Sequence, residues 1–129
     1  MKSSYKIGAA VIGSFVVGVG AASVLHAQTK PSGFVLAEID IKDQDGYNKD
    51  YLPKAQANIK ESGGKYIAGG SNKAISLSGS PLPNRVVLVQ FADMDAVKAF
   101  YAKEHVLEAD FGNKYASFRI VGIEGIEQK

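Results

Sequence analysis

Hydrophobic and polar residues alternate from Phe34 to Ile41, which predicts the first β-strand. One face of this strand is entirely apolar, and its members are Val35, Ala37, Ile39 and Ile41. The other face is mixed, and its members are Phe34, Leu36, Glu38 and Asp40. We therefore expect helices to cover the first face and a less uniform environment to meet the second.

A period of four residues then predicts a helix that packs on the sheet. Asp43 is placed to be its N-cap. The apolar stripe comprises Tyr47, Tyr51, Ala55 and Ile59. Pro53 lies inside this helix, and because proline removes a backbone donor we expect a kink or a restart there. Gly63-Gly64 supplies the helix stop.

Two more strands are predicted before the second helix. The segment 65–74 is extended, with a bulge at Gly69-Gly70, and residues 75–77 continue it. Residues 78–84, with one glycine and two prolines, form a loop. The segment Arg85–Phe91 is rich in valine and nearly continuous in apolar residues, which predicts a strand buried on both faces.

The second helix and the last strand complete the pattern. Asp93 is the expected N-cap. The helix has an apolar stripe made of Met94, Val97, Phe100 and Tyr101. Residues 104–115 add another helical turn or two, and residues 117–126 form the last strand.

The order strand, helix, strand, strand, helix, strand predicts an α+β fold. It is the ferredoxin-like βαββαβ arrangement, with a four-stranded antiparallel sheet and both helices on one face. The other face is left open, and exposing Phe34 and Leu36 there is unfavourable in water. We therefore expect a homodimer in which two copies pair through this sheet face.

The N-terminal 27 residues have the features of a secretory signal peptide. Lys2 and Lys6 precede an uncharged stretch of 19 residues, Ile7 to Leu25, and Ala27 stands before the expected cut. The stretch is also long enough for an uncleaved membrane anchor, which is the alternative. Either way the domain is expected to be exported, to the periplasm or outside the cell. Residues 28–32 are a linker and residues 33–129 the folded domain.

Composition and charge narrow the class of protein. Removing residues 1–27 takes away two lysines and no acid, so 13 basic and 13 acidic residues remain. This balance lacks the basic surplus of nucleic-acid binding proteins. The absence of cysteine excludes disulfides and thiolate metal sites, and two-histidine metal patterns are missing. We expect no metal, no cofactor, and membrane contact only through an uncleaved N-terminal segment.

Several features of the chain together resemble a known family. They are the segment Gly63-Gly-Lys-Tyr-Ile-Ala-Gly-Gly70 followed by Arg85–Phe91, Asp40 with its spacing to Asp43 and Tyr47, and the pair Phe100-Tyr101. This family is the domain of unknown function 1330 family of dimeric α+β barrel proteins. The resemblance implies a ferredoxin-like subunit whose sheet joins that of a partner. It implies no established activity, because proteins that share the architecture include cofactor-free monooxygenases, isomerases, dehydratases and haem proteins.

Two acids on the mixed face of the first strand are candidates for proton transfer. Glu38 and Asp40 lie two residues apart and share this face. Inside a closed barrel, burial would raise their pKa values and make one a general base. Asp40 is the better candidate, because it also matches the family, and Glu38 is a candidate ligand-binding residue. The alternatives are a solvent-exposed strand end or an ion pair with Arg85 or Arg119.

Four other residues offer weaker chemistry. Tyr101 and His105 are neighbours on the second helix. His105 is either a candidate proton shuttle or an exposed residue at the helix end. Tyr101 is either a candidate acid or an aromatic residue that packs in the core or an interface. Arg85 is placed to bind a ligand carboxylate or to pair with an acid. Tyr66 lines the pocket or packs in the core.

Three functions remain open. The first is a small-molecule binding protein that holds an apolar or aromatic ligand between sheet and helices. The second is a cofactor-free oxygenase or isomerase that uses an acidic residue or His105 as general base. The third is a structural or stress-associated dimer without a ligand. Whether the protein is an enzyme is left undecided by the residues.

Overall fold

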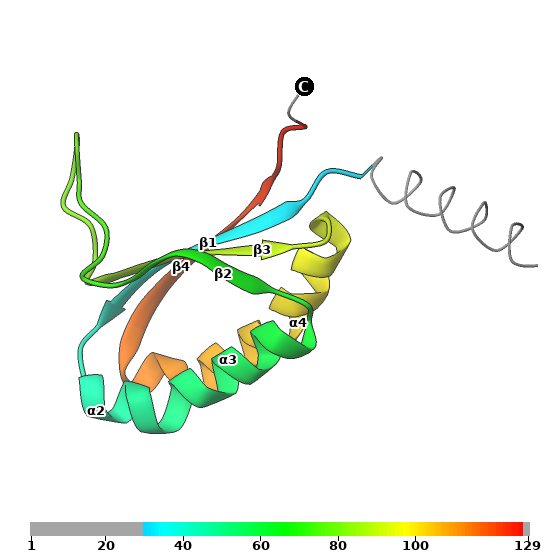
Figure 1. Cartoon of the computed structure of the whole chain (residues 1–129). Coiled ribbons are helices and arrows are strands. Elements are labelled where there is room, and N and C mark those ends of the chain that lie inside the picture. The colour runs from blue at the N-terminus through cyan, green and yellow to red at the C-terminus, as the bar shows by residue number, and fades with distance from the viewer. Residues whose placement is uncertain (1–29, 128–129) are drawn as a thin grey trace, which may run out of the picture. The chain divides into compact units, whose positions relative to one another are not determined.

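Four antiparallel strands form one sheet in the order β2-β3-β1-β4 (Figure 1). The computed structural model describes residues 30–127, so the predicted signal peptide lies outside the described residues. The strands are β1 (Gly33–Ile41), β2 (Lys65–Ser71), β3 (Arg85–Phe91) and β4 (Ala116–Glu124). The helical elements are α2 (Gln44–Gly46), a π-helical turn η1 (Tyr47–Tyr51), α3 (Leu52–Glu61), α4 (Met94–Asp110) and a 3-10 turn η2 (Gly112–Lys114).

Both main helices, α3 and α4, lie on the same face of the sheet, as predicted (Figure 1). The alternation in β1 is confirmed, because the side chains of its apolar face are all buried. They pack with the predicted helical stripe, whose four members are also buried: Tyr47, Tyr51, Ala55 and Ile59. The α+β, ferredoxin-like fold class is therefore present in the chain.

The first helix begins at the predicted cap and changes its winding before the proline. The Asp43 side chain accepts a hydrogen bond from the Gly46 N–H. The π-helical turn η1 ends at Tyr51, and α3 then starts with Pro53 in its first turn, where a missing N–H costs least. The predicted restart is therefore present as a π-helical turn before α3. This wider turn places Tyr47 and Tyr51 against the sheet. Gly63 ends the helix with φ of +79°.

The predicted position of the bulge in the second strand was wrong. The register shift lies between Tyr66 and Ala68, and Gly69 and Gly70 stay paired with β3. Gly69 is needed for another reason: a Cβ there would clash with the Val86 carbonyl oxygen. The strand also ends at Ser71, since Asn72 turns the chain with φ of +58°. Residues 75–77 therefore belong to the loop.

Burial of β3 differs between its two faces. Val87, Val89 and Phe91 point toward the helices and are buried, whereas the alternate residues are only partly buried. The single chain therefore buries β3 fully on one face only, because α3 and α4 cover one side of the sheet. Burial of the other face stays a prediction that depends on a second copy.

The second helix follows the prediction and extends it. Asp93 caps α4 by accepting a hydrogen bond from the Ala96 N–H at 2.8 Å. Its buried residues are Val97, Phe100, Glu104 and Glu108, so two acids continue the apolar stripe. Within residues 30–127, no helix combines the length and the hydropathy that a membrane crossing requires.

Candidate functional site

A cavity of about 40 Å³ lies between the sheet and the helices. Its walls are mainly aliphatic and aromatic side chains of β1, β3, η1 and α3, and its polar lining consists of Tyr47, Tyr51, Tyr66, Arg85 and Glu104. A cavity needs roughly 10–15 Å³ for each water molecule. The enclosed space therefore suits a group of a few heavy atoms.

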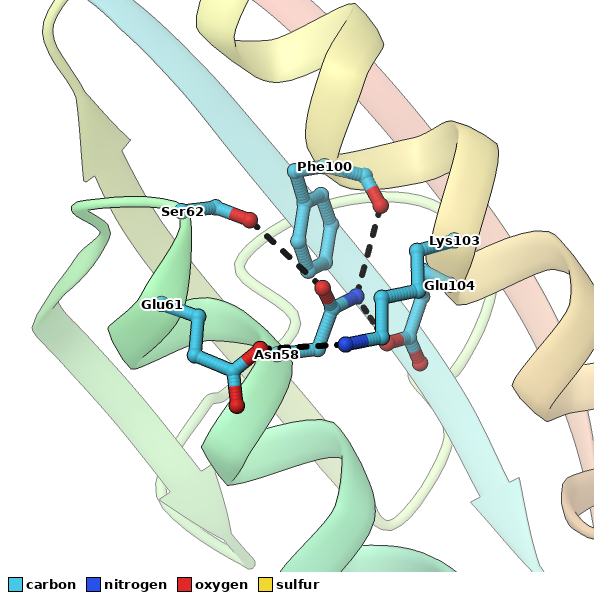
Figure 2. Close-up of polar contacts among 6 residues, drawn as sticks. All are labelled: Asn58, Glu61, Ser62, Phe100, Lys103 and Glu104. Atoms are coloured by element: carbon cyan, nitrogen blue, oxygen red, sulfur yellow. Dashed lines mark hydrogen bonds and ion pairs between the residues drawn. The ribbon is translucent and has the colours of Figure 1, made fainter.

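Glu104 is the only carboxyl group among the described residues that line this cavity. It is 3% exposed, and both of its oxygens accept hydrogen bonds. The Tyr51 hydroxyl donates to Oε2, and the Asn58 Nδ2 donates to Oε1 over 3.1 Å. Figure 2 shows how Asn58 joins the two helices, since its Nδ2 also donates to the Phe100 carbonyl oxygen at 3.3 Å. This network holds α3 and α4 in one arrangement.

The buried tyrosines carry their protons at neutral pH. Burial raises the pKa of Tyr47 to about 12, although the nearby charge of Arg85 opposes this rise. Burial also raises the pKa of Tyr51, and the carboxyl group of Glu104 adds to the shift. Both side chains are therefore hydroxyl donors at the cavity wall.

Arg85 and Tyr66 lie where the cavity meets a second depression. This outer groove, of about 320 Å³, is lined by Gln56, Tyr66–Gly70, Arg85 and Val87. Tyr66, Arg85 and Val87 thus line both the cavity and the outer groove. Tyr66 is 44% exposed, so the junction reaches the surface of the protein.

A separate polar group lies further along α4. The Tyr101 hydroxyl donates to Glu108 Oε1 over 3.2 Å, and Glu108 Oε2 is buried with no hydrogen-bond partner. Burial raises the pKa of Glu108 to about 7, against the lowering effect of the Tyr101 hydrogen bond. The ring of His105 lies 5.9 Å from that of Tyr101, and His105 itself is exposed. Neither Tyr101 nor His105 lines the cavity.

The two acids of β1 lie on the opposite side of the sheet from the cavity. Glu38 forms an ion pair with Arg119, with 2.6 Å between Oε2 and Nη1. Asp40 is exposed and lies across from Ser117 in the β1·β4 register. The structure therefore brings together Arg85 and Tyr66 among the sequence candidates, and separates them from Glu38 and Asp40.

Sequence reasoning missed the acid that lines the cavity. Glu104 follows Phe100 by four residues and Val97 by seven, so it continues the buried stripe of the helix. That spacing was a usable signal. Asn58 is also buried, at 2% exposed, and it lies one residue before a predicted stripe member.

The part of the chain that the structure describes holds no group of three or more histidine, aspartate or glutamate residues that could bind a metal ion.

Comparison with known proteins places the chain in a family without supplying a reaction. No curated protein matches the chain. A family model, described as a domain of unknown function, matches residues 32–125. This match covers all four strands and both main helices. The chain therefore belongs to the domain of unknown function 1330 family (DUF1330).

Proposed function

We propose that this domain binds a small organic molecule in the cavity between its sheet and its helices. One observation carries the proposal: the cavity and the outer groove adjoin at Tyr66, Arg85 and Val87, which line both. In this proposal a molecule enters the largely apolar cavity from the groove, past these side chains. Binding sites of this kind typically combine apolar walls with a few placed polar groups, as found here.

The proposal is tested by thermal unfolding of the full chain in the presence of a library of small organic acids, amides and alcohols. A ligand that binds the folded state raises Tm, and at a hundredfold excess over Kd the stabilisation is about 2.7 kcal/mol. We expect at least one member to raise Tm. A library in which no member changes Tm would contradict the proposal.

A matched pair of variants on α3 locates the site. Ala55 lines the cavity, whereas Ala57, two residues later, is exposed. Ala55→Leu adds side-chain volume to the cavity and is expected to abolish the ligand-dependent rise in Tm. Ala57→Leu is expected to retain it. Equal retention by both variants would place the ligand elsewhere.

Proton transfer on the bound molecule is a second candidate function, favoured by the position of Glu104. Its carboxyl group lines the cavity and is oriented by Tyr51 and Asn58, as a general base is commonly held. A ligand found by the library would then exchange a carbon-bound proton with D₂O. This exchange is measured by NMR and is expected to be lost in Glu104→Gln. Absence of exchange for every bound ligand would leave binding as the function.

We further propose that two copies pair through the open face of the sheet. The centre of this face is apolar, and its partly exposed residues are Phe34, Leu36, Val86, Leu88 and Val121. Neither α3 nor α4 covers it (Figure 1). Pairing would remove this apolar area from water. Light scattering is expected to give the mass of two chains, and the mass of one chain at high micromolar concentration would contradict pairing.

A further inference from the structure

We propose that the ligand is a short aliphatic carboxylate whose carboxylate group binds Arg85 and whose apolar end enters the cavity. This inference rests on the proposed function and names the class of molecule that the site takes. It is argued from the unpaired charge at the junction and from the sizes of the two spaces that meet there.

Among the described residues, the charge of Arg85 has no acidic partner. Its side chain forms no ion pair within residues 30–127, in contrast to Lys54, Lys103 and Arg119, which each pair with an acid. Its side-chain hydrogen-bond partners are neutral hydroxyl groups: Ser71 Oγ, at a long 3.4 Å from Nη1, and the hydroxyls of Tyr47 and Tyr66. Its Nε is buried and has no acceptor. A buried donor of a charged group is costly to leave unpaired, so an anion is the chemistry that satisfies it.

The acid in the same cavity forms no ion pair with Arg85 in the described residues. Its two oxygens instead accept hydrogen bonds from Tyr51 and Asn58. Of the other acids on the sheet, Glu38 and Asp40 lie on the opposite face from Arg85. Glu124 lies across from Gly33 at one end of β1, whereas Arg85 lies across from Ile39 near the other end. The site therefore offers a cation with free donors beside an apolar space. A carboxylate matches the planar guanidinium in geometry as well as in charge.

The size of the cavity selects the apolar part of the ligand. A cavity of about 150 Å³ is known to accept benzene, whereas the space here is about 40 Å³. A branched group of three or four carbon atoms is therefore favoured over an aromatic ring. The outer groove, at about 320 Å³, has room for a polar substituent that points away from the cavity.

Isothermal titration calorimetry on the full chain tests this inference with isobutyrate, isobutyramide, benzoate and inorganic phosphate. The amide has nearly the same shape as the acid and lacks its charge. We expect isobutyrate to bind at least tenfold more tightly than isobutyramide, benzoate or phosphate. Equal binding of acid and amide would overturn the inference while leaving the proposed function intact. Tightest binding by benzoate would overturn the size argument, and phosphate binding as tight as isobutyrate would overturn the need for an apolar end.

Two arginine variants assign the effect to one residue. In Arg85→Met, isobutyrate and isobutyramide are expected to bind equally weakly. In Arg119→Met, on the open face, the tenfold preference for the acid is expected to persist. Circular dichroism verifies that each variant is folded, and Arg85→Lys, which retains the charge, is expected to keep part of the preference. A preference for the acid that survives in Arg85→Met would refute the role of this residue. If none of the library compounds nor any of these four probes binds, the proposed function itself fails.

Discussion

The two faces of the sheet are made by the same four strands but differ in what covers them. On the helix-covered face, Val89 is 2% and Phe91 1% exposed. On the open face, the neighbouring Leu88 is only partly buried and Ile123 is 44% exposed. Burial of apolar area stabilises by about 25 cal/mol per Å². One face has therefore gained this stabilisation within the chain, and the other can gain it only through association.

Adjacent residues of β3 give the most direct test of this difference. Val89→Asp places a carboxyl group among buried side chains and is expected to lower the free energy of unfolding by more than about 4 kcal/mol. This is a large part of the stability of a typical domain. Leu88→Asp is expected to leave the fold intact and to abolish the proposed pairing of two copies, which leaves a monomer.

Circular dichroism and light scattering separate the two outcomes. The proposed difference between the two sheet faces would be refuted if Leu88→Asp unfolded the chain as completely as Val89→Asp. It would also be refuted if Val89→Asp remained as stable as the unmodified protein.

The polar network on the helix-covered side is expected to have the next largest effect. Glu104→Ala removes the acceptor of the Tyr51 hydroxyl and one of the two acceptors of the Asn58 Nδ2 group. Each buried donor that loses its acceptor costs about 1–3 kcal/mol, so the free energy of unfolding is expected to fall by about 2–6 kcal/mol. Urea denaturation measures this change.

Asp110→Ala is the matched control, since Asp110 is exposed on the same helix. Its effect is expected to stay within about 0.5 kcal/mol. Equal effects of the two substitutions would show that the Glu104 network contributes nothing specific.

Glu108 is expected to make the helix-covered side sensitive to pH. Burial raises its pKa to about 7, from the ordinary value of 4.5. Between these two values the folded protein keeps a proton that the unfolded chain has released, so the stability falls as the pH rises. The loss is complete above about pH 7 and amounts to at most about 3 kcal/mol.

Urea denaturation of the unmodified protein and of Glu108→Gln from pH 4 to pH 8 measures this contribution. The stability of the unmodified protein relative to the variant is expected to fall between about pH 4.5 and pH 7. A difference that is constant with pH would contradict the assignment, because the other titrating groups are common to both proteins.

The fold could be predicted from the sequence because its elements repeat with a simple period. The alternation in β1 and the four-residue spacing of Tyr47, Tyr51, Ala55 and Ile59 each mark a buried face. Asp43 and Asp93 mark helix starts by local hydrogen bonding. These patterns depend on residues close in sequence, so they predict the helices and strands without knowledge of tertiary contacts. The bulge near Tyr66 depends on pairing with a distant strand, and the sequence did not place it.

The candidate site was harder to predict for the same reason. Arg85, Val87 and Val89 are alternate residues of one strand, so their side chains lie on the same face. This places Arg85 on the helix-covered face. Glu104 was missed because a charged residue in a helix is usually solvated. Its partner Tyr51 is 53 residues away in sequence, so their contact is visible only in the fold. Asp40 and Glu38 were favoured because they share a face, and that face is the open one.

The binding of an anion at Arg85 is tested most directly by NMR of the arginine Nε–Hε groups in the ¹⁵N-labelled full chain. The Arg85 signal is assigned by its loss in Arg85→Lys. Addition of isobutyrate is expected to shift the Nε–Hε signal of Arg85 together with methyl signals of Val87 and Val89, and to leave the Arg119 signal in place. An Arg85 signal that does not move at saturating isobutyrate, or that moves equally with isobutyramide, would contradict the proposed binding site.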